Sequence, residues 1–288
     1  MVFVIPPNPK VPRLRAYLLP SFPLSELPAF KQAFEFGTCA PFNPMLELVI
    51  AHAPADWAGQ SFEYMRRKED EAGREAPFVV VDERGAGGRD GAVWYVEHFA
   101  TEDEVEDGEA ASTSVVWRIP VKTDCLALMW VNYDIANMSL QEDLCNLGVE
   151  LPVDANYEVL EVDNCGGLDM ESERKTKRAV VVAEPGEFVE RTDEAPTNTH
   201  RPVPPRRVGR LKDARSMAWD LKVSANVCYA GLAETVGLVN EWSTLTNLRS
   251  WKKPDGTKRQ FPEGSIELWL KYDPDFDWPE YKWPEGSL

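Results

Sequence analysis

Histidine and cysteine, the residue types that most often serve as metal ligands or nucleophiles, are few and scattered in this sequence. None of the three histidines belongs to a His-Glu-x-x-His motif or to another zinc-ligand spacing. Cys165 lies in the turn-like run Asp163-Asn164-Cys165-Gly166-Gly167, where acidic neighbours oppose the low thiol pKa that a nucleophile needs. We therefore interpret Cys165 as a turn residue. The sequence predicts no metal site and no cofactor, and it leaves the catalytic residues unknown.

Two further motifs resemble ligand-binding loops but depart from the required pattern. The run Asp273-Pro274-Asp275-Phe276-Asp277 starts like a calcium-binding EF-hand loop. Trp278, however, stands where that loop needs glycine, and Pro284 stands where it needs glutamate. The glycine-rich run 85–88 lacks the Gly-Lys-Ser/Thr sequence of a phosphate-binding loop. We interpret the first motif as a solvated acidic turn and the second as a turn between strands.

Tryptophan is the chemically informative residue that is concentrated in one part of the chain. Six of the ten tryptophans follow residue 211, namely Trp219, Trp242, Trp251, Trp269, Trp278 and Trp283. Trp278 and Trp283 each precede a proline, which has no amide donor and is excluded from regular strand interiors. Their rings either fasten the C-terminal tail onto the main domain or form a contact surface for a partner. We take Trp269, Trp278 and Trp283 as the candidate binding residues.

The charge of the chain restricts its partners. It has 48 acidic and 31 basic residues and a net charge of −17. This charge disfavours nucleic acid and anionic membranes, and it favours a basic protein surface or a cationic small molecule. The stretch 102–109 holds six acids in eight residues, which predicts a mobile, solubilising loop.

The cysteine pattern and the N-terminus predict a cytoplasmic protein. The five cysteines are odd in number and form no Cys-x-x-Cys pair, as expected for reduced thiols (Cys39, Cys125, Cys145, Cys165 and Cys228). The apolar N-terminus reaches Pro6 after five residues, which is too short for the core of a signal peptide. No stretch approaches the roughly 20 apolar residues of a membrane span.

Several helices are expected before and after a central β region. Apolar spacing predicts a short helix from about residue 26 that ends near Gly37, and an amphipathic helix within 56–71. The apolar run 45–50 fits either a helix or a buried strand. Ser139-Leu140-Gln141-Glu142 is a capping box, and Leu144 lies on the apolar face of the helix that it starts.

The central region is predicted to be an antiparallel sheet. The runs 78–81 and 92–96 flank a glycine-rich turn and predict a hairpin, and 114–119 and 126–131 add two strands. Charged residues and prolines crowd 169–210, which predicts a linker or surface excursion. The alternating run 266–272 predicts a strand in the C-terminal part.

The expected fold class is therefore α+β, with an antiparallel sheet, helices packed on one face and a smaller Trp-rich C-terminal unit. The expected domains are 1–168, the linker 169–210 and the unit 211–288.

The middle stretch resembles a domain of unknown function that occurs in fungal and bacterial proteins. The likeness covers about residues 77–150 and rests on Phe78-Val79-Val80-Val81-Asp82, Val116-Trp117-Arg118-Ile119-Pro120 and Ile135-Ala136-Asn137-Met138. It implies a compact α+β module and transfers no catalytic residue.

These observations favour a cytoplasmic binding or regulatory protein that recognises a protein or small-molecule partner through aromatic and acidic surface. The alternative is an enzyme that acts on a small neutral or cationic substrate by carboxylate acid/base chemistry, because carboxylates that converge only in the fold leave no local signature. A deep apolar pocket with convergent carboxylates would favour the enzyme, and a flat aromatic patch would favour the binding protein.

Overall fold

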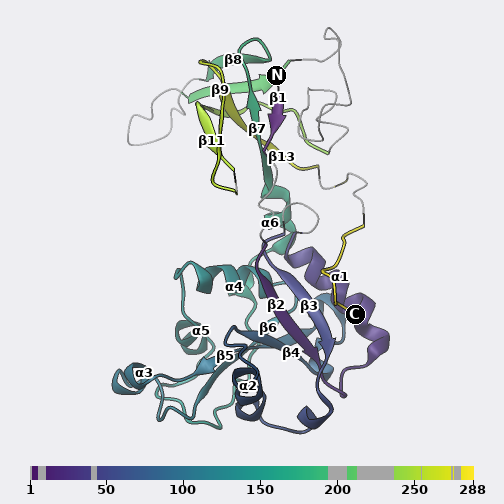
Figure 1. Cartoon of the computed structure of the whole chain (residues 1–288), viewed down its shortest axis with the longest axis vertical. Helices are drawn as coiled ribbons and strands as arrows, with labels where there is room; N and C mark the ends of the chain where they lie inside the picture. The colour runs from purple at the N-terminus through teal and green to yellow at the C-terminus, as the bar shows by residue number, and fades with distance from the viewer. Residues whose placement is uncertain are drawn as a thin grey trace. The chain divides into compact units, whose positions relative to one another are not determined.

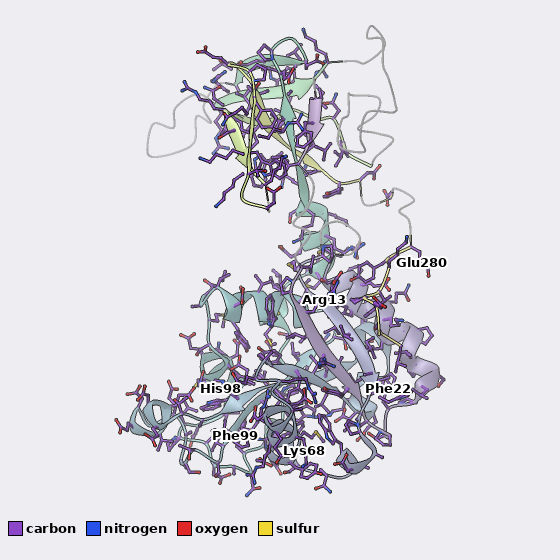
Figure 2. All side chains as sticks on the ribbon, viewed as in Figure 1. Arg13, Phe22, Lys68, His98, Phe99 and Glu280 are labelled. Carbon is purple, nitrogen blue, oxygen red and sulfur yellow. The ribbon has the colours of Figure 1, made fainter. Side chains whose placement is uncertain are left out.

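The computed structural model describes residues 2–5, 11–39, 44–193, 206–212, 237–253, 255–273, 275 and 280–288. Their contacts divide the chain into two compact units (Figure 1). The larger unit comprises residues 11–170 together with 280–288, and the smaller unit comprises residues 1–10 together with 171–279. Glu280, labelled in Figure 2, begins the C-terminal segment of the larger unit.

The larger unit is built on a five-stranded mixed sheet in the order β3-β2-β4-β5-β6. Its strands are β2 (Arg13–Leu18), β3 (Glu47–His52), β4 (Phe78–Val81), β5 (Ala92–Phe99) and β6 (Val116–Lys122). β2 pairs in parallel with β3 and β4, whereas β4, β5 and β6 pair antiparallel. The purely antiparallel sheet predicted from the sequence is therefore wrong. The parallel pairs arise because helices connect β2 to β3 and β3 to β4, as parallel strands require.

Helices cover both faces of this sheet, which corrects the expectation of one covered face. The helices of the larger unit are α1 (Leu27–Gly37), α2 (Phe62–Glu71), α3 (Glu102–Glu106), α4 (Leu126–Asp134) and α5 (Leu140–Asn146). Trp94 and Tyr95 are neighbours on β5, so they point to opposite faces. The Trp94 ring contacts Phe62 of α2, and the Tyr95 ring contacts Tyr133 of α4.

Most locally encoded elements form as predicted. The capping box of α5 is present, with Ser139 Oγ accepting from the Glu142 amide at 3.1 Å, and Leu144 is fully buried. The 78–81 and 92–96 hairpin forms β4 and β5, and residues 47–50 of the ambiguous run 45–50 lie in the strand β3. α1 ends at Gly37, where an added Cβ would lie 1.9 Å from the Asp124 carbonyl oxygen.

Two local predictions are wrong. The apolar run 126–131 is part of α4 and not a strand, because an unbroken apolar run fits a buried helix as well as a buried strand. The acidic stretch 102–109 contains α3, which starts with a capping box between Thr101 and Glu104. Gln141 Nε2 also donates to Glu104 Oε1 at 2.9 Å. Acidic residues in the first turn of a helix lie at the positive end of the helix dipole. Their attraction to this end stabilises the turn and offsets their mutual repulsion.

The smaller unit is a six-stranded antiparallel sheet in the order β1-β7-β13-β10-β9-β8, with a separate hairpin of β11 and β12. The strands are β1 (Val2–Val4), β7 (Arg178–Ala183), β8 (Phe188–Asp193), β9 (Arg206–Leu211), β10 (Ser243–Asn247), β11 (Ser250–Lys252), β12 (Lys258–Gln260) and β13 (Ile266–Lys271). β13 confirms the strand predicted at 266–272.

The stretch 169–210, predicted as a linker, holds all of α6 (Met170–Thr176), β7 and β8, and most of β9. The charges do not exclude strands here, because in β7 and β9 exposed arginines share the strand with buried valine or leucine residues.

The fold class is α+β, as predicted. None of the helices in the described part of the chain combines the length and the apolar character that crossing a membrane requires.

Candidate functional site

Two of the three tryptophans predicted to bind a partner, Trp269 and Trp283, belong to different units of the chain. Trp269 lies on β13 of the smaller unit with 49% of its surface exposed, and its indole nitrogen donates to Glu267 Oε1 at 2.5 Å. It lines an open pocket of about 520 Å³ with Trp242, so its role in binding stays a prediction. Trp283 belongs to the larger unit. Trp278 lies outside the described residues.

Trp283 packs against α1 and holds the C-terminal segment 280–288 on the larger unit. Its ring centroid lies 5.9 Å from that of Phe34, and its indole nitrogen donates to Glu35 Oε1 at 2.6 Å. The Lys31 ammonium lies 4.7 Å from the ring centroid. The following residues continue the attachment, because the Leu288 amide donates to the Ile50 carbonyl at 2.9 Å. The geometry is that of the first alternative, in which the ring holds the tail on the domain.

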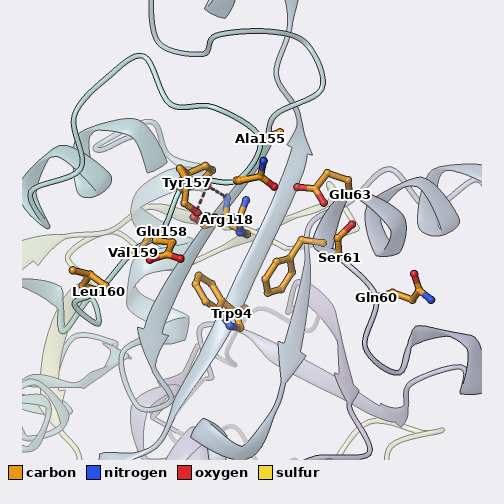
Figure 3. Close-up of a pocket in the computed structure, with 12 residues that line it drawn as sticks. Gln60, Ser61, Glu63, Trp94, Arg118, Ala155, Tyr157, Glu158, Val159 and Leu160 are labelled. Atoms are coloured by element: carbon orange, nitrogen blue, oxygen red, sulfur yellow. Dashed lines mark hydrogen bonds between the residues drawn. The ribbon is translucent and has the colours of Figure 1, made fainter.

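A different pocket, which sequence reasoning missed, surrounds Arg118 (Figure 3). Its volume is about 500 Å³, and it lies between the start of α2, the strands β5 and β6, and the segment 155–160. We call it the arginine pocket, and its lining residues are Gln60, Ser61, Phe62, Glu63, Trp94, Arg118, Ala155, Asn156, Tyr157, Glu158, Val159 and Leu160.

Arg118 is positioned by β6 and by the backbone of the segment 155–160. Strand alternation places it on the face that α2 covers, opposite Val96 of β5. Its Nη2 donates to the Tyr157 carbonyl at 2.7 Å, and its Nη1 donates to the Val116 carbonyl at 3.4 Å. The guanidinium carbon lies 4.2 Å from the Tyr157 ring centroid and 5.2 Å from that of Phe62. Two rings and two carbonyls therefore fix the orientation of this cation.

Arg118 is a buried charge without a counterion. Only 7% of its surface is exposed, and no carboxylate of the described residues lies within 4.0 Å of its guanidinium. Arg66, a second buried arginine of the larger unit, differs in this respect, because its Nη2 lies 2.7 Å from Asp70 Oδ1. Arg66 also donates to the carbonyls of Ala76, Glu97 and Arg74. Since a buried charge is normally paired, Arg66 is a structural residue and Arg118 is a candidate functional one.

Tyr157 makes the frame of the pocket rigid. Its hydroxyl accepts from the Arg118 amide at 2.7 Å and lies 2.7 Å from the Arg118 carbonyl, to which it donates. Burial raises the pKa of Tyr157 to about 12, so the hydroxyl stays protonated at neutral pH. The ring therefore stays neutral beside the cation.

The start of α2, which lines the same pocket, has two amides without a hydrogen-bond partner among the described residues. Ser61 caps the helix by accepting from the Tyr64 amide at 3.3 Å. The two amides are those of Phe62 and Glu63. Such amides at a helix start attract anions. Figure 3 shows Arg118 with Tyr157 and Glu158 on one side and Glu63 on the other.

A second pocket, of about 560 Å³, brings two buried carboxylates of the larger unit together. It lies beside α4 and α5 and includes Asp143, Asp163 and Cys165. Tyr133 donates its hydroxyl to Asp143 Oδ2 at 2.7 Å. Burial and the neighbouring Asp143 raise the pKa of the Asp163 carboxyl. A hydrogen bond with Cys125 and burial raise the pKa of the Cys165 thiol, which keeps it protonated and consistent with a turn residue.

Among the described residues, no group of three or more His, Cys, Asp and Glu side chains is placed to hold a metal ion. Comparison with known proteins gave no matching family model, curated protein or solved structure. The resemblance over residues 77–150 therefore stays a prediction.

The sequence signal for Arg118 was a single charge inside the apolar run Val116-Trp117-Arg118-Ile119-Pro120. Its pocket partners come from three distant stretches, which only the fold brings together.

Proposed function

We propose that this chain is a cytoplasmic binding protein and that its larger unit binds a ligand that carries a carboxylate group. The observation that supports this proposal is the burial of Arg118 without a counterion at the wall of an open pocket. A buried cation is costly when nothing compensates it, and a planar guanidinium matches a carboxylate with two parallel hydrogen bonds.

The surroundings of Arg118 support a small ligand. The rings of Phe62 and Trp94 and the side chain of Leu160, 90% exposed, offer apolar contact beside the cation. The lining combines these apolar groups with polar and charged side chains, and small-molecule sites likewise use polar groups to orient a ligand among apolar contacts. The free amides of α2 supply further donors for the same anionic group.

The division of charge between the units argues against polyanionic partners. The larger unit holds 31 acidic and 12 basic residues, a net charge of −19, whereas the smaller unit holds 17 acidic and 19 basic residues, a net charge of +2. A strongly negative unit repels phosphate backbones and anionic lipid surfaces. We therefore propose a small-molecule or protein partner, and neither nucleic acid nor membrane.

The test is calorimetric titration with 3-phenylpropionate and with its uncharged amide, 3-phenylpropionamide. A charged hydrogen-bonded pair is worth about 1.5–3 kcal/mol, so the acid is expected to bind roughly 10- to 150-fold more tightly than the amide. Arg118→Met should remove this difference, and Arg118→Lys should reduce it because lysine lacks the planar fork. Arg13→Met, which removes an exposed arginine of the same unit, is the matched control. Equal binding of acid and amide, or unchanged binding by a folded Arg118→Met, would overturn the proposal.

A second candidate function is favoured by the pocket at Asp143 and Asp163. Two neighbouring buried carboxylates, one with a raised pKa, are the arrangement that acid/base chemistry on a small neutral or cationic substrate uses. A thermal-shift screen of a metabolite library against wild type, Asp163→Asn and Arg118→Met separates the two. Compounds whose stabilising effect is lost only in Asp163→Asn, and which wild type then converts, would favour the enzyme.

A further inference from the structure

The arginine pocket holds opposite charges that do not neutralise each other. Glu63 and Glu158 line it together with Arg118, yet neither carboxylate lies within 4.0 Å of the guanidinium. No residue in the described ranges forms an ion pair or a hydrogen bond with the side chain of either glutamate. The pocket thus contains one cation and two carboxylates, and none of the three forms an ion pair with a described residue.

The positions of these groups explain why they stay apart. Arg118 is held by the Tyr157 and Val116 carbonyls and stacks against two rings, so it cannot swing toward the rim. Glu63 is in the first turn of α2, where the positive end of the helix dipole favours a carboxylate without any ion pair. Glu158 follows Tyr157 directly on the opposite side of Arg118 (Figure 3).

A ligand with charges of both signs fits this arrangement better than a simple anion. A plain carboxylate would pair with Arg118 but would meet two uncompensated glutamates and the field of a unit with a net charge of −19. A plain cation would leave the buried Arg118 without a partner. A molecule that carries a carboxylate and an ammonium group satisfies both and has no net charge for the field to repel.

We propose that the ligand of the arginine pocket is a zwitterion of the α-amino acid type, with its carboxylate at Arg118 and its ammonium group at Glu63. The apolar part of the ligand lies against Trp94, Phe62 and Leu160. This assignment rests on the proposed carboxylate site at Arg118 and adds to it the class of ligand.

The test compares pairs of compounds that differ only in the ammonium group. L-phenylalanine is titrated beside 3-phenylpropionate, and L-leucine beside 4-methylpentanoate, so that two side chains are covered. At least one amino acid is expected to bind about fivefold or more tightly than its deaminated partner, since a partly exposed charge pair contributes up to about 1 kcal/mol. Added salt screens the repulsion between the negatively charged unit and the deaminated acids, so it should strengthen their binding. It should leave amino-acid binding nearly unchanged.

Two variants of the same helix locate the ammonium group. Glu63→Gln should abolish most of the preference for the amino acid while leaving binding of the deaminated acid equal or stronger. Glu71→Gln removes the same charge from the other end of α2, where Glu71 pairs with Lys68, and should leave the preference intact. Equal loss in both variants would show that the general field, and not a local contact, creates the preference.

The outcomes separate this inference from the function on which it rests. If the deaminated acids bind as tightly as the amino acids and Arg118→Met abolishes both, the carboxylate site stands and the zwitterion assignment is overturned. If neither member of either pair binds to wild type, the proposed function fails with it.

Discussion

Replacing Trp283 by alanine tests whether the C-terminal segment stabilises the larger unit. A fully buried tryptophan truncated to alanine costs about 3–5 kcal/mol, so a half-buried ring is expected to cost about 2 kcal/mol. The hydrogen bond to the Glu35 carboxylate adds about 1 kcal/mol after allowance for solvent. The expected loss in the free energy of unfolding is therefore about 3 kcal/mol. For a unit of this size, that corresponds to a Tm lower by roughly 6–12 °C.

The assay is differential scanning calorimetry of the full chain, in which the transition of the larger unit should move and that of the smaller unit should stay. Trp283→Phe is the matched variant, because it keeps a ring against Phe34 and removes only the indole donor to Glu35. It should lose about 1 kcal/mol. If both transitions of Trp283→Ala stay within about 2 °C of wild type, Trp283 does not hold the C-terminal segment on the larger unit. Trp283 would then be a candidate contact residue for a partner.

Four further predictions address other parts of the molecule. Leu144→Ala should destabilise the larger unit by about 2–5 kcal/mol in urea unfolding, because Leu144 is fully buried; a loss below about 1 kcal/mol would contradict its place in the core. Thr101→Ala removes the cap of α3 and should cost about 1 kcal/mol; an unchanged unfolding midpoint would show that the cap contributes nothing. Because the folded state raises the pKa of Asp163 above its unfolded value of about 3.9, wild type loses stability as the pH rises through the raised pKa. The stability of Asp163→Asn relative to wild type should therefore increase as the pH rises above about 4 in urea unfolding, and a constant difference would contradict the raised pKa. Trp269→Ala should keep the Tm within a few degrees and weaken capture of a partner from lysate, whereas Ile135→Ala, at another exposed apolar position, should not.

Elements encoded by neighbouring residues could be predicted from the sequence. The α5 capping box needs only Ser139 and Glu142, three positions apart, and the β13 strand needs only its own alternation. The run 126–131 could not be assigned in this way. Its apolar residues suit a buried strand and a buried helix equally, and tertiary packing decides between them.

The candidate site could not be predicted because its parts are distant in the sequence. Phe62, Trp94, Arg118 and Tyr157 come from α2, β5, β6 and the segment 155–160, and none of them forms a recognisable motif with its neighbours. The tryptophan prediction relied on composition, which shows where rings are numerous but not which are covered. Trp283 and Trp269 illustrate this, because the first packs on Phe34 and the second is half exposed.

The pairing of β1 with β7 sets an order of events during synthesis. Val2–Val4 is synthesised well before its partner strand, Arg178–Ala183, which follows roughly 175 residues later. At about 5–20 residues per second, β1 waits roughly 10–35 s for a neighbour, while residues 11–170 can already collapse. The larger unit in turn receives its segment 280–288 only after roughly 110 residues of the smaller unit have been made. Each unit is therefore completed by a segment that the sequence of the other unit separates from its main part, and a single cut near residue 170 leaves both units incomplete.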